Sequence, residues 1–236
     1  MTNMDVTIIT GASRGIGEAI ARKLAIENHF VILLGRDEVK LKSLFNEINS
    51  FGSADYFAGD INDLDFIKSV VESVIEKHGR IDHLINNAGI MIIKKIIDAS
   101  VDEFIQQMNT NVISVFNFTK IVLPYMISQK SGSIINISSL AGKNSFVGGT
   151  MYSTTKHALM GFTKSLMLEV REHNIRVAAV CPGSVSTDLL LNSPMNPKDK
   201  TKILQPSDIA EVVSSIIKLP PNALVSEIEI RPTNPN

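Results

Sequence analysis

The sequence TGASRGIG, residues Thr10 to Gly17, joins an apolar run at 6–10 to a helical pattern at 15–27. Its three glycines stand where a chain must turn tightly and where a ligand must come close to the backbone. The free N–H groups and the positive dipole end of the following helix offer an anion site that suits a pyrophosphate. The spacing is G-x3-G-x-G, a relative of the G-x-G-x-x-G fingerprint, and a plain strand-to-helix turn is the alternative.

The same alternation of strand and helix continues along the chain. Short, β-rich apolar runs occur at 6–10, 30–34, 55–58, 83–86, 133–137, 176–181 and 228–230. Helical patterns lie between them at 15–27, 37–50, 62–78, 101–130, 150–173 and 207–218. The nearly continuous apolar run Val31-Ile32-Leu33-Leu34 is typical of strands buried on both faces of a parallel sheet. We therefore predict an α/β fold: a doubly wound, Rossmann-like parallel sheet of about seven strands with helices on both faces.

Residues 1–236 are predicted to form a single dinucleotide-binding and catalytic domain, because no linker, repeat or low-complexity segment divides them. Hydrophobic residues make up 44% of the chain and charged residues 20%, which suits one sizeable core. The helical and strand patterns break down at 189–202, a stretch that we expect to lack regular structure and to serve as a lid.

Charge and composition argue against several classes of partner. With 23 basic and 24 acidic residues and no dense basic stripe, the chain is not expected to bind nucleic acid. No apolar stretch reaches the ~20 residues that span a bilayer and no signal peptide precedes the first strand, so no membrane association is expected. The lone Cys181 fits a reducing compartment, and we predict a cytoplasmic location. No catalytic metal is expected, because ligand spacing is missing at all the histidines: His29, His78, His83, His157 and His173.

The second predicted strand ends at Leu34-Gly35-Arg36, where an NAD-specific site would need a carboxylate for the ribose 2′-OH. No acidic residue stands at that point. Gly35 leaves room, and Arg36, helped by Arg14, can offer planar donors to a 2′-phosphate. The alternative is that Arg36 is a solvated surface residue, with Asp37 weakening the local positive field. We favour NADP(H) as the cofactor.

Tyr152 and Lys156 lie four residues apart in a predicted helix, so their side chains share one face. A neighbouring ammonium stabilises phenolate and lowers the pKa of a tyrosine, which could then exchange a proton with a substrate oxygen. A Tyr-x3-Lys pair can arise by chance, but Ser139 lies just beyond the predicted strand 133–137, where ligands of open α/β sheets bind. Ser138 is the competing candidate.

A wider set of motifs resembles the short-chain dehydrogenase/reductase family over nearly the whole chain. The residues that carry this resemblance are Thr10 to Gly17, Asn86-Asn87-Ala88-Gly89, Asn111, Ser139, Tyr152, Lys156 and Pro182-Gly183. Within the family, the chain is most similar to the short form, especially NADP-dependent reductases of the 3-oxoacyl-carrier-protein or 3-hydroxy-acid type. The resemblance implies hydride transfer between a nicotinamide and a small-molecule carbonyl or secondary alcohol.

The resemblance also implies a role for each catalytic position. Tyr152 would be the general acid/base, and Ser139 would orient and polarise the carbonyl. Lys156 would hold the nicotinamide ribose and lower the tyrosine pKa. Asn111 would support a water and a proton relay behind the lysine, its alternative being a polar residue at a helix bend.

For the cofactor, Asp60-Ile61 resembles the pair that contacts adenine, with a helix cap as the alternative for Asp60. The turn Asn87 to Gly89 resembles the one along the adenine ribose, and Pro182-Gly183 with Val185 and Thr187 resembles the nicotinamide segment. The full predicted cofactor set is Gly11, Ser13, Arg14, Gly15, Ile16, Gly17, Arg36, Asp60, Ile61, Asn87, Ala88, Gly89, Tyr152, Lys156, Pro182, Gly183, Val185 and Thr187.

We predict that the substrate pocket is built from the loops at 90–95, 140–151 and 189–204. These loops do not identify the substrate. An apolar lining is predicted, although core or interface packing is an equal alternative for the same side chains: Phe146, Val147, Leu189, Leu190, Leu191 and Met195. The resemblance implies a homo-oligomer, a tetramer or dimer, built through the two long helices. The C-terminus lacks the Gly-Gly of many relatives, which leaves the acyl-carrier assignment open.

Two other functions compete with reduction. One is a catalytically silent dinucleotide-binding sensor or scaffold, and the presence of Asn111, Ser139, Tyr152 and Lys156 argues against it. The other is an NAD-linked alcohol dehydrogenase acting mainly in oxidation, and Gly35-Arg36 argues against that.

Overall fold

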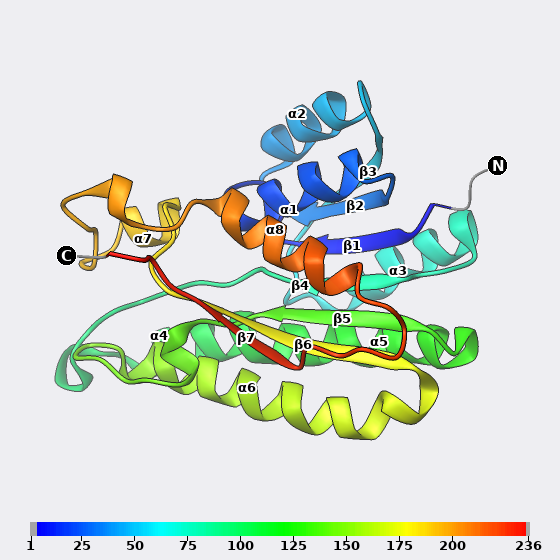
Figure 1. Cartoon of the computed structure of the whole chain (residues 1–236). Helices are drawn as coiled ribbons and strands as arrows, with labels where there is room; N and C mark the ends of the chain where they lie inside the picture. Colours follow the sequence, from blue (N-terminus) through cyan, green and yellow to red (C-terminus); the bar gives the residue numbers. More distant parts are fainter. Residues whose placement is uncertain (1–3, 235–236) are drawn as a thin grey trace.

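The computed structural model describes residues 4–234 and contains a seven-stranded sheet in which every pairing is parallel (Figure 1). The strand order is β3-β2-β1-β4-β5-β6-β7. The strands are β1 (Val6–Thr10), β2 (Phe30–Gly35), β3 (Ser53–Ala58), β4 (His83–Asn86), β5 (Gly132–Ile137), β6 (Ile175–Pro182) and β7 (Glu227–Ile230). The predicted Rossmann-like parallel sheet is therefore confirmed, with each strand boundary within two residues of its expected place.

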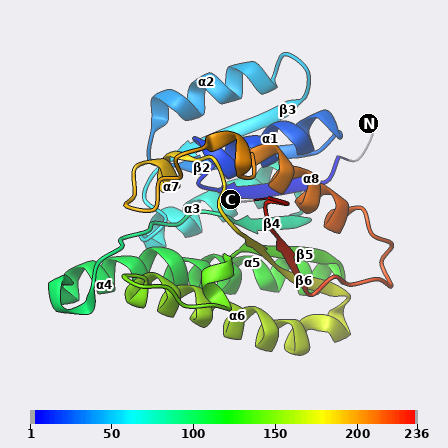
Figure 2. The ribbon, with the colours of Figure 1, turned by 60° about the vertical axis from the view of Figure 1, so that its left-hand side comes forward.

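Helices cover both faces of this sheet (Figures 1 and 2). They are α1 (Gly15–Ile26), α2 (Glu38–Ile48), α3 (Leu64–His78), α4 (Val101–Met108), α5 (Ser114–Gln129), α6 (Thr150–Val170), α7 (Asp188–Leu191) and α8 (Pro206–Ile217). Within residues 4–234, none of them has both the length and the hydropathy needed to cross a bilayer.

The core consists of two apolar layers because successive strand residues point to opposite faces. In β1, Ile9 packs in the layer beneath α1, α2 and α8, whereas Ile8 packs in the layer beneath α3, α5 and α6. Both side chains are fully buried. This two-sided burial explains why the strands are apolar runs rather than alternating patterns.

Two expectations about the helices are corrected by the structure. The predicted helix 101–130 is helical but contains a π-helical turn, Asn109–Ile113, between α4 and α5. The stretch 189–202 is not wholly irregular, because it contains part of α7 and a 3-10 turn, Lys200–Lys202. Buried Leu190 and a parallel bridge between Val185 and Leu204 anchor this segment against the rest of the chain.

All strands run in the same direction, so their carboxyl ends meet at one edge of the sheet. The turn after β1, the loops after β4 and β5, and α7 lie together at this edge, on the left in Figure 1. The connections thus gather at one place the motifs that the sequence spreads over most of its length.

Candidate active site

The glycine-rich turn after β1 has the backbone conformation that its composition predicts. Gly11 and Gly15 have φ of +67° and +62°, a region that side chains other than glycine rarely adopt. A Cβ atom on Gly17 would lie 2.4 Å from the Gly11 carbonyl oxygen and 2.5 Å from Asn87 Nδ2. The turn therefore requires glycine at these places, and it leads into the N-terminus of α1 as an anion site would.

Hydrogen bonds hold this turn against the one that follows β4. Asn87 Nδ2 donates to the carbonyl oxygens of Thr10 and Gly11, at 2.9 and 3.2 Å. The Thr10 hydroxyl accepts from the backbone N–H groups of Asn87 and Ala88, both at 3.0 Å. The two turns that the resemblance assigns to the cofactor therefore form one rigid wall.

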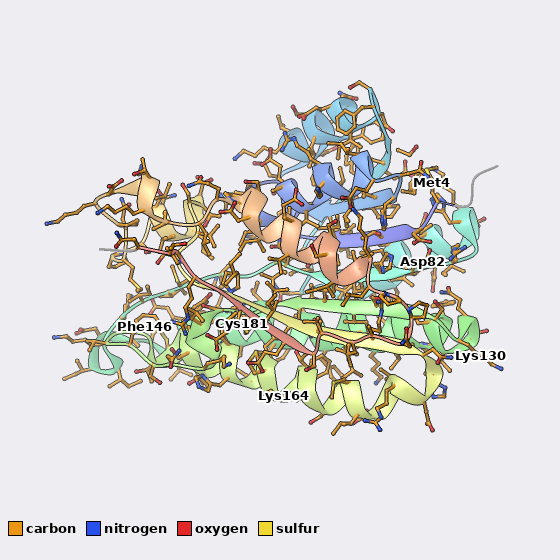
Figure 3. The ribbon with its side chains drawn as sticks, viewed as in Figure 1. Met4, Asp82, Lys130, Phe146, Lys164 and Cys181 are labelled. Carbon is orange, nitrogen blue, oxygen red and sulfur yellow. The ribbon has the colours of Figure 1, made fainter. Side chains whose placement is uncertain are left out.

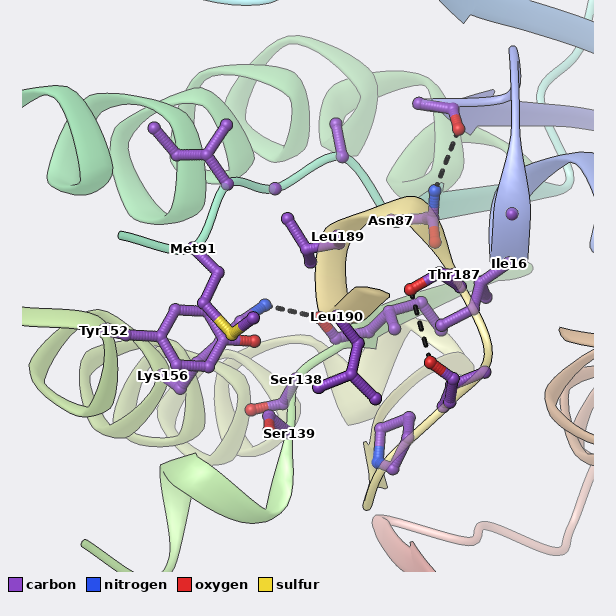
Figure 4. A pocket seen from close by; sticks show the side chains of 18 of the residues that line it. Ile16, Asn87, Met91, Ser138, Ser139, Tyr152, Lys156, Thr187, Leu189 and Leu190 are labelled. Atoms are coloured by element: carbon purple, nitrogen blue, oxygen red, sulfur yellow. Dashed lines mark hydrogen bonds between the residues drawn. The ribbon is translucent and has the colours of Figure 1, made fainter. Parts of the chain in front are cut away.

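This wall borders a cavity of about 860 Å³ at the carboxyl edge of the sheet. Figure 4 shows Ile16, Asn87 and Thr187 on one side, Tyr152 and Lys156 on the other. Of the predicted cofactor residues, all line the cavity except Gly17, which lies behind the turn it makes possible. The volume and the close-approach glycines fit a dinucleotide.

Gly35, the last residue of β2, lines the cavity together with Arg36 and Asp37, which follow the strand. The Asp37 carboxylate accepts a hydrogen bond from the Lys40 N–H at 3.1 Å and so caps the N-terminus of α2. Arg14 also lines the cavity, where its Nη1 lies 3.5 Å from Asp188 Oδ2. The structure thus brings both predicted arginines to the site and adds Asp188 as a partner that the sequence did not suggest.

Asp60 does not cap a helix, contrary to the alternative raised from the sequence. Its Oδ1 accepts from both the backbone N–H and the side-chain amide of Asn62, at 2.9 Å each. The cap of α3 is Asp63, whose carboxylate accepts from two N–H groups of the first turn. Asp60 and Ile61 therefore form a fixed loop at the cavity wall.

Lys156 is buried among protein atoms and points toward the cavity. Its Nζ donates to the Ile137 carbonyl oxygen at 2.9 Å and lies 5.8 Å from the centroid of the Tyr152 ring. Burial lowers the pKa of Lys156 to about 8, because the apolar surroundings disfavour the charged form. This ammonium therefore titrates close to physiological pH.

Tyr152 lies next to Lys156, and 7% of the tyrosine surface is exposed. Burial raises the pKa of Tyr152 to about 12, and only the contact with Ser139 acts in the lowering direction. The sequence predicted a lowered pKa from the lysine, but desolvation is the larger effect in this arrangement. The tyrosine hydroxyl is therefore protonated at neutral pH in the cofactor-free protein, the state in which it can donate a proton.

The structure distinguishes the two serines at the end of β5. Ser139 contacts the Tyr152 hydroxyl, and its Oγ accepts from the Ala141 N–H at 3.1 Å. Ser138 Oγ is buried without a hydrogen-bond partner in the described part of the chain, and it faces Gly142, where an added Cβ atom would lie 2.9 Å from this oxygen. Ser139 is accordingly the one associated with the tyrosine; Figure 4 shows both serines at the end of β5.

Asn111 lies in the π-helical turn, 1% exposed, behind the cavity wall. Its Oδ1 accepts from the Ile90 N–H at 2.8 Å, and its Nδ2 donates to the Ile90 carbonyl oxygen and to Thr155 Oγ1, at 2.9 and 3.0 Å. The side chain therefore ties the loop after β4 to α6, the helix that carries Tyr152 and Lys156.

The apolar side of the cavity agrees with the sequence in part. Phe146, Leu189, Leu190 and Met195 line it, whereas Leu191 does not and Val147 is 87% exposed. Val147 lies in the loop between β5 and α6 and projects into solvent, so it does not line the pocket. Met91 and Leu140 of the predicted pocket loops also line the cavity, together with two residues outside those loops that the sequence analysis missed, Arg231 and Pro232. The last two follow the carboxyl end of β7, the signal that could have identified them.

Residues 5–197 match the family model described as short chain dehydrogenase. The chain belongs to this family. As a short chain dehydrogenase it is 34% identical over 227 residues, 96% of each chain, to an uncharacterized oxidoreductase of Staphylococcus aureus (strain USA300). It is 36% identical over 216 residues, 88% of each chain, to the 3-oxoacyl-(acyl-carrier-protein) reductase of Thermotoga maritima.

Solved structures resemble this short chain dehydrogenase over almost its full length. A metagenomic short-chain oxidoreductase in complex with NADP has a TM-score of 0.85 and 36% identity, covering 97% of both chains. Actinorhodin polyketide ketoreductase with NADPH has a TM-score of 0.91 and 30% identity, covering 98% of this chain and 97% of that one. The protein is thus an oxidoreductase of a family that acts on small molecules.

Proposed function

We propose that this short chain dehydrogenase is an NADP(H)-dependent carbonyl reductase that interconverts a carbonyl and a secondary alcohol. The observation that carries the proposal is the meeting of Ser139, Tyr152 and Lys156 in the same cavity as the glycine-rich turn. NADPH, when bound, supplies the hydride that the carbonyl carbon receives. The protein supplies the proton, the orientation and the electrostatic environment.

In this proposal Tyr152 donates its proton to the carbonyl oxygen as negative charge develops there. The pKa of about 12 keeps the hydroxyl protonated until that moment. Ser139, in contact with the tyrosine hydroxyl, holds the same oxygen by a second hydrogen bond. Asn111 acts as a positioning residue, because it fixes the loop at Ile90 and the α6 helix at Thr155.

Lys156 would bind the nicotinamide ribose through its ammonium group, beside the tyrosine. The pyrophosphate would rest on the turn around Gly11 and Gly15, and the adenine end would lie along Asp60 and Ile61. These are the parts of one cavity, which supports a single extended dinucleotide rather than two separate ligands.

The preference for NADP(H) rests on Arg36, which lines the cavity, as does Arg14. Asp37, the carboxylate that follows Arg36 in the chain, is engaged in capping α2. Two similar proteins, the metagenomic oxidoreductase and the polyketide ketoreductase, were solved with NADP and NADPH, which agrees with this choice. The apolar side chains of Phe146, Leu189 and Leu190 favour a hydrophobic carbonyl substrate.

The direct test is a paired titration of NADPH and NADH by nicotinamide fluorescence, followed by NADPH oxidation with a panel of hydrophobic ketones and 3-oxoacyl thioesters. Tight NADPH binding with turnover of any panel member supports the proposal. Binding without turnover on a broad panel supports a silent dinucleotide sensor. Tighter binding of NADH, with alcohol oxidation faster than reduction, supports an NAD-linked alcohol dehydrogenase.

The pH dependence of kcat/KM for NADPH should follow the ionisation of the Lys156 ammonium. Because its pKa in the cofactor-free protein is about 8, the ammonium is fully present below that pH and is lost as the pH rises through it. We expect kcat/KM for NADPH, which reports groups of the free enzyme, to be level below pH 8 and to fall about tenfold per unit above it.

Lys156→Arg is the matched variant for this profile, since a guanidinium stays charged throughout the measured range. We expect a lower kcat/KM that no longer falls near pH 8. If the variant retains the fall of the parent enzyme, another group is responsible for it.

A further inference from the structure

The opposite edge of the sheet, where the strands begin, brings together three residues that lie far apart in the sequence. Asp5 directly precedes β1, His29 directly precedes β2, and His83 is the first residue of β4. Strand β1 lies between the other two in the sheet. In Figure 3, Asp82 and Met4 mark this edge, at the far end of the molecule from Phe146.

The strand register places the three side chains on one face. Thr7 lies directly opposite His83, so the two residues share a face of the parallel pair. Asp5 is two residues before Thr7 and therefore on that face as well. His29 joins them, because its Nδ1 lies 3.1 Å from Thr7 Oγ1.

The three groups are close enough to share one ion. One ligand atom from each of Asp5, His29 and His83 lies within 4.8 Å of the others. His83 Nε2 is 3.5 Å from Asp5 Oδ2, and the two imidazole rings are 5.3 Å apart between centroids. Tetrahedral ligands at about 2.0–2.1 Å from zinc lie about 3.4 Å apart, so the side chains would rotate inward to close around an ion.

His83 has no hydrogen bond that explains its burial. It is 6% exposed, and neither of its ring nitrogens has a hydrogen-bond partner in the range 4–234. Buried polar nitrogens are nearly always paired, because leaving one unpaired costs free energy. Its Nε2 faces the Asp5 carboxylate at 3.5 Å and its ring lies beside that of His29, an arrangement that a cation bound between the three groups would satisfy.

Within residues 4–234, Arg80 is the one lysine or arginine that forms an ion pair with this group. Its positive charge is already balanced by the carboxylate of Asp82. Its Nη2 lies 3.6 Å from Asp5 Oδ1, the oxygen that does not face His83. The same guanidinium pairs with the buried carboxylate of Asp82 through Nε at 2.8 Å and through Nη2. Arg80 can therefore orient the Asp5 carboxylate from behind, as outer-shell groups do at metal sites.

We propose that Asp5, His29 and His83 bind a divalent transition metal ion of the zinc type. The Nε2 atoms of the two histidines and one oxygen of Asp5 would be the protein ligands, with water completing a tetrahedron. Thr7 would hold the other nitrogen of His29 and so fix its orientation. The site lies at the opposite edge from the nucleotide cavity, so it is a clamp on the starts of β1, β2 and β4 rather than a catalytic centre.

The test uses the untagged full chain, stripped with a chelator and then titrated with Co²⁺ followed by visible absorption and with Zn²⁺ followed by calorimetry. We expect one ion per chain, a cobalt spectrum of tetrahedral type, and a higher Tm with Zn²⁺. Asp5→Asn should weaken Zn²⁺ binding by at least about tenfold, since even outer-shell changes weaken metal sites by 10–100-fold.

Asp5→Asn is the decisive variant, because this side chain is 48% exposed and its replacement leaves the core intact. His83→Gln should give at least the same loss, with circular dichroism to verify folding. The matched control is His173→Gln, in the 3-10 turn that follows α6 and outside the three-residue group, which should bind Zn²⁺ like the parent. Absence of one-to-one binding, or equal affinity in Asp5→Asn and the parent, overturns the proposal.

Discussion

Replacing Tyr152 with phenylalanine is expected to lower kcat for carbonyl reduction by about 10²–10⁴-fold, the range that a general acid contributes. The hydroxyl in contact with Ser139 is the proton source of the proposed reaction. The ring itself is buried and packs near the Lys156 ammonium, and phenylalanine keeps that ring. We therefore expect the Kd of NADPH to change by less than about twofold, because the proposed role of the lost oxygen is to donate a proton to the substrate.

Single-turnover kinetics with saturating NADPH measure this effect on the chemical step. Tyr125→Phe is the matched control, because it removes a hydroxyl from α5, outside the residues that line the cavity. It should leave kcat unchanged. Retention of more than about a tenth of the parent rate in Tyr152→Phe would falsify the assignment of Tyr152 as the acid, given the range above.

Arg36→Ala is expected to weaken NADPH binding by about 10–100-fold and to leave NADH binding unchanged. A hydrogen bond to a charged group contributes about 1.5–3 kcal/mol, and about 1.4 kcal/mol corresponds to a tenfold change in Kd. Arg36 lines the end of the cavity next to Gly35, where the 2′-phosphate of NADPH would lie and where NADH carries only a hydroxyl.

The control for this experiment is Lys42→Ala, which removes one positive charge from the exposed surface of α2 outside the cavity lining. It separates a specific phosphate contact from a general loss of positive field. Equal weakening of both cofactors by Arg36→Ala would show that the residue supports the site rather than recognises the phosphate. Unchanged affinity for both cofactors would show that Arg36 is a solvated surface residue without a role in binding.

Local patterns predicted the elements well where one short segment contains the whole signal. The run Val31 to Leu34 is apolar at every position, and the structure buries all four side chains in β2. The glycine-rich turn likewise encodes its own conformation, as the positive φ of Gly11 and Gly15 shows. The single-domain organisation over 1–236 and the homo-oligomer stay predictions.

Sequence patterns failed to predict the properties of a side chain that depend on residues packed around it from other parts of the chain. The position after the strand could not separate Ser138 from Ser139, which only the family resemblance did, because both follow the same strand and the path of the loop directs one of them to Tyr152. It also mistook the direction of the Tyr152 pKa shift. Adjacency on a helix was visible, but the desolvation that outweighs it depends on everything packed around the ring.

The chain alone was enough to predict the parallel sheet, the conformation of the glycine-rich turn and a set of catalytic candidates, because helix and strand periods, glycine conformations and short motifs are read within single segments. Only the folded protein decided the hydrogen bonds of Asn87 to the turn 77 residues earlier, and the meeting of Asp5, His29 and His83 at the other edge. Such contacts follow from strand order and register, which depend on how all the elements pack together, and so no spacing within one segment can reveal them.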